Sequence, residues 1–166
     1  MKELNIAIIT VSDSRDDKTD KSGNLLKKLI SDANHMIKDK KIVKDNIYEI
    51  RLEVSKNIYN PLIDVIILTG GTGITGRDGT PEAVIPLLDK IIDGFGEMFR
   101  LISSKKIKTS SLQSRALAGV ANGTFVFVLP GSVDACKTAW NEIISDQLNS
   151  DTKPCNLVML MPRLKE

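Results

Sequence analysis

The sequence is poor in the residues that hold small metal-bound and disulfide-bonded proteins together. It contains two cysteines, Cys136 and Cys155, and a single histidine, His35. Structural zinc sites need several such ligands at short spacings, so a zinc site is not predicted. One pair of cysteines does not make a disulfide framework either. We therefore expect both cysteines to be buried free thiols and His35 to be structural.

Aromatic residues and an excess of one charge are also lacking. Aromatic residues make up 4% of the chain, and 23 basic residues nearly balance 21 acidic ones, which leaves a net charge of +2. Single-stranded nucleic acids are held by aromatic stacking, and all nucleic acids by positive charge. A nucleic-acid partner is therefore not expected.

Long apolar runs are absent as well. A membrane-spanning helix needs roughly 20 apolar residues, whereas the run Leu4–Val11 is ended by Ser12, Asp13 and Arg15. The same polar residues, without a small-residue cleavage site, argue against a signal peptide. We expect no membrane partner, a cytoplasmic location, and a first β-strand at Leu4–Val11.

Alternating strand and helix patterns account for most of the chain. The 166 residues, 42% of them hydrophobic, are enough for one domain spanning residues 1–166. Strand-like runs occur at Leu4–Val11, Met36–Val43, Val65–Thr69, Phe125–Leu129 and Leu157–Met161. Most of them are continuously apolar, which predicts strands covered on both faces. Helical repeats between them predict an α/β fold, a three-layer α/β/α sandwich with a mostly parallel central sheet.

The helices are predicted from apolar residues three and four positions apart. The first helix begins at Asp20 or Ser22 and ends at Asn34 in the left-handed conformation. Three further helices contain Ile47 to Ile58, Ala83 to Ile91, and Ala135 to Ile144, with Trp140 in the core or at a subunit interface. Residues 94–122 show two helical patches without a clear strand between them and predict a helical excursion. Lys38 to Lys41 are expected to be a solvated strand end.

A glycine-rich loop follows the third predicted strand, at the edge where ligands of open α/β sheets bind. Residues 70–80 contain five glycines. Glycine permits positive φ angles and a close approach of the backbone, so that amide groups can bind an anion. Thr80 and Pro81 suit the start of a helix whose positive end adds to this potential. A tight turn without a ligand would use the same glycines, but the adjacent Arg77 and Asp78 favour phosphate binding.

Two nucleotide-binding motifs fail on their context. Gly71, Gly73 and Gly76 match the dinucleotide fingerprint, but the helix is predicted to begin only at Thr80, and no acidic residue ends a following strand at the required distance. A nicotinamide-dependent oxidoreductase is therefore a poor hypothesis. The chain also lacks the Gly-Lys-Ser/Thr sequence of the phosphate-binding loop of nucleotide hydrolases.

Several motifs, in order, resemble the MoaB/Mog family of molybdenum cofactor biosynthesis proteins, and most closely its MoaB branch. They span nearly the whole chain, at Thr10–Asp13, Ile42–Asp45, Leu68–Gly73, Arg77–Ala83, Gly94–Arg100, Thr109–Ser110, Ser114–Ala116 and Leu129–Ser132. The resemblance implies binding of molybdopterin, a pterin with a dithiolene and a terminal phosphate, and assembly into a homo-trimer or homo-hexamer. Active members adenylylate that phosphate with Mg-ATP. Gly79, Lys44 and the short C-terminal tail depart from the family pattern, in which valine, proline and a longer, histidine-containing tail are common.

The implied reaction joins two polyanions, so it needs positive charge and in-line positioning. Magnesium prefers a few carboxylates together with phosphate oxygens. Asp45 and Asp78 follow or adjoin predicted strand ends and match family positions associated with catalysis, which predicts them as catalytic residues and Mg²⁺ ligands. From the residues alone, Asp45 could instead cap the following helix.

The predicted substrate-binding residues come from several polar segments. The glycine loop and the turn at Pro130–Ser132 predict two anion sites, one for the substrate and one for the nucleotide. A polar cluster is expected to hold the pterin phosphate, and Ser12 either lines the same rim or starts a turn. The residues are Ser12, Thr69, Gly70, Gly71, Thr72, Gly73, Thr80, Ser110, Ser111, Ser114, Arg115, Pro130, Gly131 and Ser132.

Structural alternatives remain for two of these segments. Ser132 could be only the cap of the next helix, and the cluster around Arg115 could be a helix start with a solvated arginine. The leading hypothesis is a molybdopterin adenylyltransferase that uses ATP and Mg²⁺. The alternative is a non-catalytic molybdopterin-binding scaffold of the same family.

Overall fold

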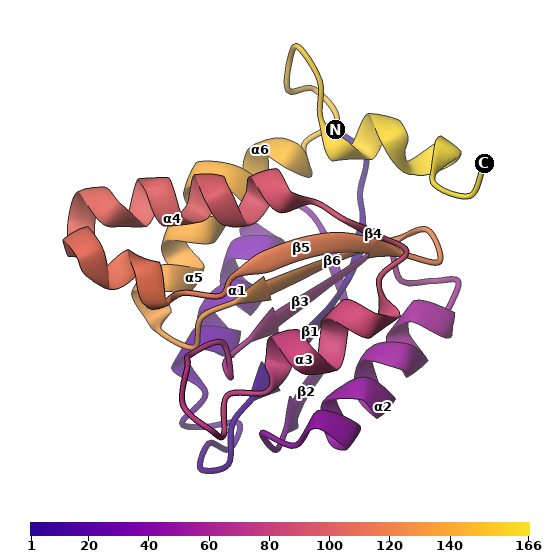
Figure 1. The fold of residues 1–166 in the computed structure, drawn as a ribbon. Helices are drawn as coiled ribbons and strands as arrows, with labels where there is room; N and C mark the ends of the chain where they lie inside the picture. Colours follow the sequence, from indigo (N-terminus) through magenta and orange to yellow (C-terminus); the bar gives the residue numbers. More distant parts are fainter.

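The computed structural model describes all 166 residues, as one six-stranded sheet with helices on both faces (Figure 1). The strand order is β2-β1-β3-β6-β5-β4. The first four strands of this order are parallel, whereas β5 and β4 pair antiparallel. The predicted three-layer, mostly parallel architecture is thereby confirmed. The strands are β1 (Asn5–Val11), β2 (Met36–Val43), β3 (Val65–Thr69), β4 (Lys90–Ile91), β5 (Leu117–Ala121) and β6 (Thr124–Leu129).

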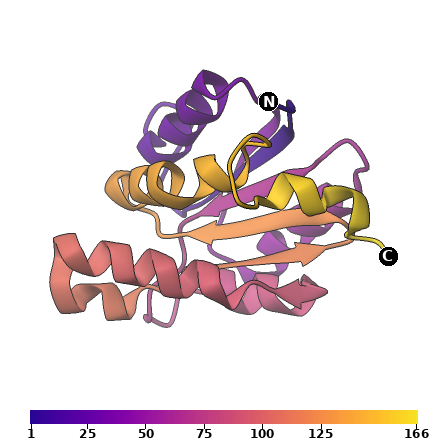
Figure 2. The same ribbon diagram turned by 90° about the horizontal axis from the view of Figure 1, so that it is seen from above.

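The helices form two layers around this sheet. Helices α1, α4 and α5 cover one face, and α2 and α3 cover the other (Figure 2). No helix has the length and apolar character that a membrane crossing requires. The α-helices are α1 (Lys21–Asp32), α2 (Ile47–Tyr59), α3 (Thr80–Val84), α4 (Asp93–Ile107), α5 (Val133–Ala139) and α6 (Ser145–Gln147). A π-helix, η3 (Trp140–Ile144), joins α5 to α6, and short 3₁₀ helices are η1 (Ile85–Leu87), η2 (Lys108–Gln113) and η4 (Leu157–Arg163).

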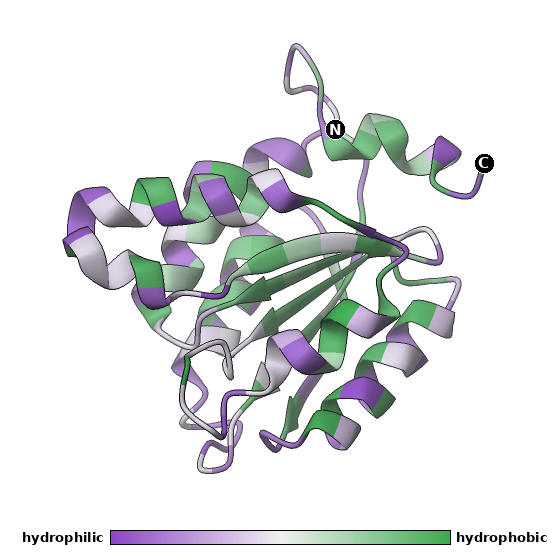
Figure 3. Ribbon diagram, in the orientation of Figure 1, coloured by the Kyte–Doolittle hydropathy of each residue, from purple (hydrophilic) through white to green (hydrophobic).

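The sheet divides the core into two apolar clusters. Successive strand residues point to opposite faces, so Ile6 and Ile8 join the cluster under α1 and α5, while Ala7 and Ile9 join the cluster under α2. Hydropathy colouring shows the central strands as almost uniformly apolar (Figure 3). Because both faces are covered, these strands read as continuous apolar runs in the sequence.

The ends of the first helix agree with the sequence. The Asp20 side chain accepts a hydrogen bond from the amide of Gly23 (3.0 Å), and Asn34 has a φ of 58°. His35 is buried and accepts a hydrogen bond from the amide of Leu4 (3.2 Å), as a structural histidine would. Trp140 is buried in the core.

Two expectations about surface and interior are wrong. Lys40 is not a solvated residue of the strand end, because its ammonium lies 3.0 Å from the fully buried carboxylate of Asp20. Cys136 is buried as expected, but Cys155 is exposed, because it lies in the loop between α6 and η4.

The predicted strand at Leu157–Met161 is wrong, since these residues form the 3₁₀ helix η4. The run was interpreted as a strand because it is continuously apolar. Its residues nevertheless contact the core at helical intervals, with Val158 buried and Met161 and Leu164 packed against the same cluster. Asn156 starts the helix by accepting a hydrogen bond from the amide of Met159 (3.0 Å).

The region 94–122 is helical only in its first part. Helices α4 and η2 confirm the two patches with no strand between them, but a helical excursion as far as residue 122 was wrong, because β5 follows at Leu117–Ala121. The small residues of β5 gave no clear strand pattern in the sequence. Gly119 is needed in this strand because an added Cβ would lie 2.6 Å from Lys90 O. The Asn122–Gly123 pair, with φ of 49° and 82°, forms the tight turn into β6 and was an overlooked hairpin signal.

The helix predicted to reach Ile91 also ends early. Helix α3 stops at Val84, and β4 occupies Lys90–Ile91. Pro86 lacks an amide donor and disfavours helical geometry in the residue before it, so the chain continues only as the short 3₁₀ helix η1.

Candidate functional site

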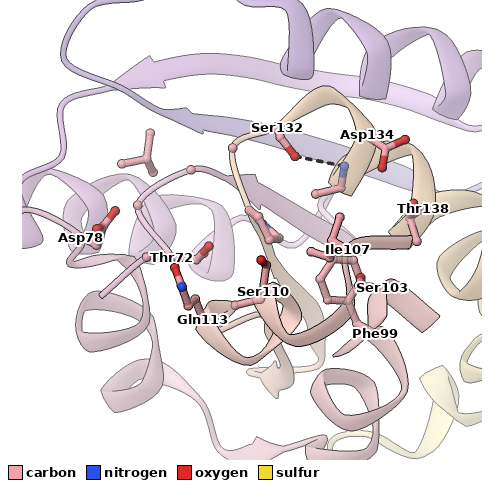
Figure 4. Close-up of a pocket in the computed structure, with 18 of the residues that line it drawn as sticks. Thr72, Asp78, Phe99, Ser103, Ile107, Ser110, Gln113, Ser132, Asp134 and Thr138 are labelled. Carbon is pink, nitrogen blue, oxygen red and sulfur yellow. Dashed lines mark hydrogen bonds between the residues drawn. The ribbon is translucent and has the colours of Figure 1, made fainter. Parts of the chain in front are cut away.

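A cavity of about 780 Å³ opens where the parallel strands β1, β3 and β6 end. Helices α4 and η2 and the start of α5 complete its walls (Figure 4). In Figure 4, Asp78 lies at one side of the cavity and Thr138 and Asp134 at the other. Most of the predicted substrate-binding residues line it, namely Ser12, Gly70, Gly71, Thr72, Gly73, Ser110, Ser114, Pro130, Gly131 and Ser132, together with Asp78.

The three strand ends meet at Gly70. Its φ is 109°, and a Cβ on it would lie 2.2 Å from the carbonyl oxygen of Val11 at the end of β1. A Cβ on Gly131, after β6, would lie 3.3 Å from the Cα of Gly70. Only glycine permits this combination of conformation and close approach. The glycines thus bring three loops together at one edge of the sheet.

The glycine loop presents backbone donors to the cavity. The amides of Gly71 and Thr72 donate no hydrogen bond to any protein acceptor, and both residues line the cavity. Gly71 has a φ of 63°. Successive free amides in such a turn make a concave site for anions. Free amide donors thus lie where the sequence predicts an anion site, and anion binding there stays a prediction.

Two of the predicted site residues support the loop from behind. Thr69 and Thr80 are fully buried and do not line the cavity. Thr69 Oγ1 donates to the carbonyl of Pro130 (2.9 Å), and Thr80 Oγ1 donates to the carbonyl of Gly70 (2.9 Å). Thr80 is not the helix cap, because Gly79 occupies that position without a side-chain bond. Pro81 does lie in the first turn, as expected.

The two aspartates approach the glycine loop at two different glycines. A Cβ on Gly71 would lie 2.9 Å from Asp45 Oδ2, and one on Gly73 would lie 2.6 Å from Asp78 Oδ2. Asp45 does not cap α2, whose cap is Asn46; Asp45 Oδ1 instead accepts from the amide of Gly79 (3.3 Å). Asp78 lines the cavity, whereas Asp45 does not.

The environments of these carboxyls shift their pKa values in opposite directions. Burial raises the pKa of Asp45, and the negative charges of Asp78 and Asp13 raise it further. The hydroxyl of Thr75, 2.5 Å from Asp78 Oδ2, lowers the pKa of Asp78. Asp45 therefore carries a charge that its surroundings do not fully neutralise. A cation beside it would relieve that cost.

The residues present fit a magnesium ion only in part. No three acidic, histidine or cysteine side chains lie close enough to hold a metal ion. Mg²⁺ commonly takes one or two carboxylates and completes its shell with water and substrate phosphates. Asp78 lines the cavity and Asp45 lies against Gly71 of the same loop, so a metal ion held by both would form its site only together with a phosphate ligand.

The polar cluster after α4 divides into lining and supporting residues. Ser110 and Ser114 line the cavity. Ser111 is buried, and its hydroxyl donates to the carbonyl of Lys108 (2.9 Å). Arg115 does not reach the cavity as predicted, and it is not a solvated arginine either. Its guanidinium donates to the carbonyls of Gly73 (2.8 Å) and Asp78 (2.7 Å) and pairs with Glu82.

The remaining predicted residues combine structural and lining positions. Ser132 Oγ caps α5 by accepting from the amide of Ala135 (3.1 Å), the bond drawn in Figure 4. Ser12 Oγ accepts from the amides of Ser14 (3.3 Å) and Arg15 (3.2 Å) and thus forms a turn while lining the cavity.

Several lining residues were missed by sequence reasoning. They include two cations, Arg15 and Lys106, as well as Phe99, Ser103, Gln113 and Thr138. The helical spacing of Phe99, Ser103 and Lys106 places them on one side of α4, but nothing in the sequence indicated that α4 faces the loop. Arg15 could have been found, since it follows the first strand at the same sheet edge as the glycine loop.

This chain is a three-layer α/β domain with a glycine-rich loop at the ends of its parallel strands. Proteins of this class bind phosphate-bearing ligands at that edge of the sheet. Residues 7–150 match the family model described as "Probable molybdopterin binding domain". This chain belongs to that family.

Individual relatives agree with the family model. The chain is 50% identical over 161 residues to molybdenum cofactor biosynthesis protein B of Escherichia coli (strain K12), covering 97% of this chain and 93% of the relative. A crystal structure of a molybdenum cofactor biosynthesis protein B superposes with a TM-score of 0.89 at 41% identity, covering 98% of this chain and 96% of the other. The tungsten cofactor synthesizing protein MoaB from Pyrococcus furiosus has a TM-score of 0.82 at 34% identity, covering 100% and 99%. The role of the chain in molybdenum cofactor biosynthesis follows from this membership.

Proposed function

We propose that this protein binds molybdopterin in the cavity and transfers an adenylyl group from Mg-ATP to its terminal phosphate. The observation that carries the proposal is the proximity of two carboxylates, Asp45 and Asp78, to a loop with free amide donors. The loop suits a phosphate, and the carboxylates suit the cation that two reacting polyanions require.

The proposed reaction exchanges one phosphoanhydride bond for another. An oxygen of the pterin's terminal phosphate attacks the α-phosphorus of ATP, and the bond between the α- and β-phosphates breaks to release pyrophosphate. Bound magnesium would supply charge neutralisation on the phosphate oxygens. The free amides of Gly71 and Thr72 bind phosphate oxygens, and the walls around Phe99 and Gln113 offer an apolar and polar surface for the pterin.

A substitution at Asp78 tests this proposal. Purified protein with molybdopterin, ATP and Mg²⁺ is expected to release pyrophosphate, and Asp78→Asn is expected to lower the rate at least about 100-fold, because a preorganised electrostatic contact is lost. The asparagine can still accept the hydrogen bonds from Thr75, so the variant is expected to fold. Asp146→Asn, on the exposed surface of α6, is the matched control. Equal rates in the Asp78 variant and wild type would contradict the assignment.

A non-catalytic scaffold is the second candidate, and one contact favours it. Asp78 Oδ2 already accepts from the amide (3.0 Å) and hydroxyl (2.5 Å) of Thr75, so a metal ion must compete with two hydrogen bonds. Retained molybdopterin binding without pyrophosphate release would select this function over the transferase.

We also propose that the chain assembles as a homo-trimer or homo-hexamer. Large apolar side chains remain exposed along α4 and η2, including Met98, Leu101 and Leu112, at 51%, 66% and 82%. Exposed apolar side chains in such numbers are typical of contact surfaces. Light scattering coupled to size-exclusion chromatography measures the assembly, and a monomeric mass would contradict it.

A further inference from the structure

Two cationic side chains line the cavity, and they differ in how their charge is neutralised. The ammonium of Lys106 lies 3.9 Å from a carboxylate of the same cavity, that of Asp134, and 2.9 Å from Thr138 Oγ1. Arg15 is held by neutral acceptors. Its guanidinium donates to Ser22 Oγ (2.5 Å) and to the carbonyl of Gly131 (3.2 Å).

The carboxylate nearest to Arg15 is already neutralised by another residue. Asp20 lies 3.9 Å from the guanidinium, beyond hydrogen-bond distance, and its side chain is fully buried. It accepts from the hydroxyl of Thr10 (2.9 Å) and from the amide of Gly23 (3.0 Å), and it forms an ion pair with Lys40 at 3.0 Å. Lys40 also lies 3.5 Å from the exposed carboxylate of Asp17, so Asp20 and Lys40 are both paired without Arg15.

Arg15 is the member of this group that lines the cavity, and no carboxylate lies within hydrogen-bond distance of its guanidinium. Its side chain is 33% exposed, against 14% for Lys40. A guanidinium has five N–H donors, and the protein accepts hydrogen bonds from only two of its nitrogens. The Nε group has no protein acceptor. The guanidinium is thus fixed in place, while its Nε–H group stays free to donate to a ligand.

The position of Arg15 matches the anion site of the glycine loop. It follows β1 and reaches the carbonyl of Gly131 after β6, and these two strands flank β3 in the sheet. The side chain therefore crosses the strand end from which the glycine loop departs. The free amides of Gly71 and Thr72 line the same cavity. Planar guanidinium groups bind phosphate oxygens with two parallel hydrogen bonds.

We infer that Arg15 is the phosphate-binding arginine of this cavity, and that Ser22 is a positioning residue that holds its guanidinium. This inference rests on the proposed function for the identity of the ligand, but not on the transfer step. The phosphate is either the terminal phosphate of molybdopterin or the triphosphate of ATP. Both offer the same chemistry to the arginine, and binding measurements on each distinguish them.

The experiment compares dissociation constants of wild type, Arg15→Gln and Arg15→Lys for three probes: molybdopterin, phosphatase-treated molybdopterin, and ATP with Mg²⁺. Arg15→Gln is expected to weaken one phosphate-bearing probe roughly 10- to 100-fold, the range for loss of charge-assisted hydrogen bonds. It should also flatten the salt dependence of that affinity. Arg15→Lys should regain part of the loss, since the charge returns without the fork. The matched control is Arg163→Gln, an exposed arginine paired with Glu166 on η4, and it should bind like wild type.

Ser22→Ala tests the positioning role. It removes one acceptor of the guanidinium and should weaken the same probe less than Arg15→Gln does, with the thermal midpoint unchanged. The probe that loses affinity identifies the phosphate. Unchanged affinity of Arg15→Gln for both phosphate-bearing probes, or an equal loss for the dephosphorylated pterin, overturns the inference.

The outcome is separable from the transferase proposal. A wild-type protein that binds molybdopterin but releases no pyrophosphate refutes adenylyl transfer, while Arg15 is still judged by the binding data. A wild-type protein that binds none of the probes overturns both.

Discussion

Substitution of Gly71 by alanine is the sharpest test of how the glycine loop is built. The residue has a φ of 63°, and a Cβ there would lie 2.3 Å from Thr80 Oγ1 and 2.9 Å from Asp45 Oδ2. The left-handed backbone alone costs an alanine about 1–2 kcal/mol. To make room, the Thr80 hydroxyl must leave its hydrogen bond to the Gly70 carbonyl (2.9 Å). Loss of a buried partner of this kind costs about 1–3 kcal/mol.

The two costs together lower the free energy of unfolding by about 2–5 kcal/mol. For a chain of this size, 1 kcal/mol corresponds to a change in Tm of about 2–4 °C, so Gly71→Ala should unfold roughly 5–20 °C below wild type. Differential scanning calorimetry measures the shift. Pyrophosphate release should also fall at temperatures where the variant is folded, because the new methyl group displaces the Asp45 carboxylate.

Gly76 is the matched control within the same loop. Its φ is not positive, and a Cβ on it meets no atom within 4 Å. Gly76→Ala should therefore leave Tm within about 2 °C of wild type, since no strain or overlap is introduced. A Gly71 variant as stable as wild type, or equal destabilisation by both substitutions, would show that close packing at Gly71 does not hold the loop.

Three other predictions concern charge and reactivity. Arg115→Ala should lower the free energy of unfolding by about 2–3 kcal/mol in chemical denaturation, because two carbonyls of the glycine loop lose a charged donor, whereas exposed Arg163→Ala should cost less than about 0.5 kcal/mol. The pKa of Asp45 is raised above 3.8, so its contribution to stability falls as pH increases from about 3.8 through the folded-state pKa. At neutral pH, Asp45→Asn should therefore raise Tm by roughly 1–5 °C and weaken stabilisation by Mg²⁺ in thermal scans; a lowered Tm would refute the uncompensated charge. Burial raises the pKa of the Cys136 thiol to about 11, so at pH 8 a thiol reagent should label only exposed Cys155 rapidly, and fast labelling of two thiols per chain would contradict the burial of Cys136.

Most of the fold could be predicted because each parallel strand carries its own signal. The ranges predicted for β2 and β3 agree with the structure, and those for β1 and β6 differ by one residue. The failures share a cause. The strand β5 is made of small residues, and η4 is a continuous apolar run. In neither segment does the spacing of apolar residues distinguish a strand from a helix. Their conformations are fixed by packing against other elements, which is tertiary information.

The candidate site could be predicted only in part, for a different reason. The glycine loop could be predicted because its residues are consecutive and glycine has a local meaning. The roles of Thr80 and Arg115 could not, because each depends on where a distant carbonyl lies. Arg115 is separated from Gly73 by 42 positions, and Arg15 from Gly131 by 116. Polar residues near a predicted site are thus easily found, whereas the distinction between lining and supporting residues requires the packed structure.

That distinction has a measurable consequence for the whole site. The supporting side chains donate their hydrogen bonds to backbone carbonyls of the loops. Substitution of Thr69, Thr80 or Arg115 should therefore lower stability and ligand affinity together. Asp78 and Arg15 line the cavity and keep part of their hydrogen-bonding capacity free, so conservative substitutions there should lower affinity or transfer while the thermal midpoint stays close to wild type. Two such groups of variants would mean that the loops are assembled by one set of side chains and used by another. If the site folded only around its ligand, the two groups of variants would not differ. Every substitution would then change the thermal midpoint only when the ligand is present.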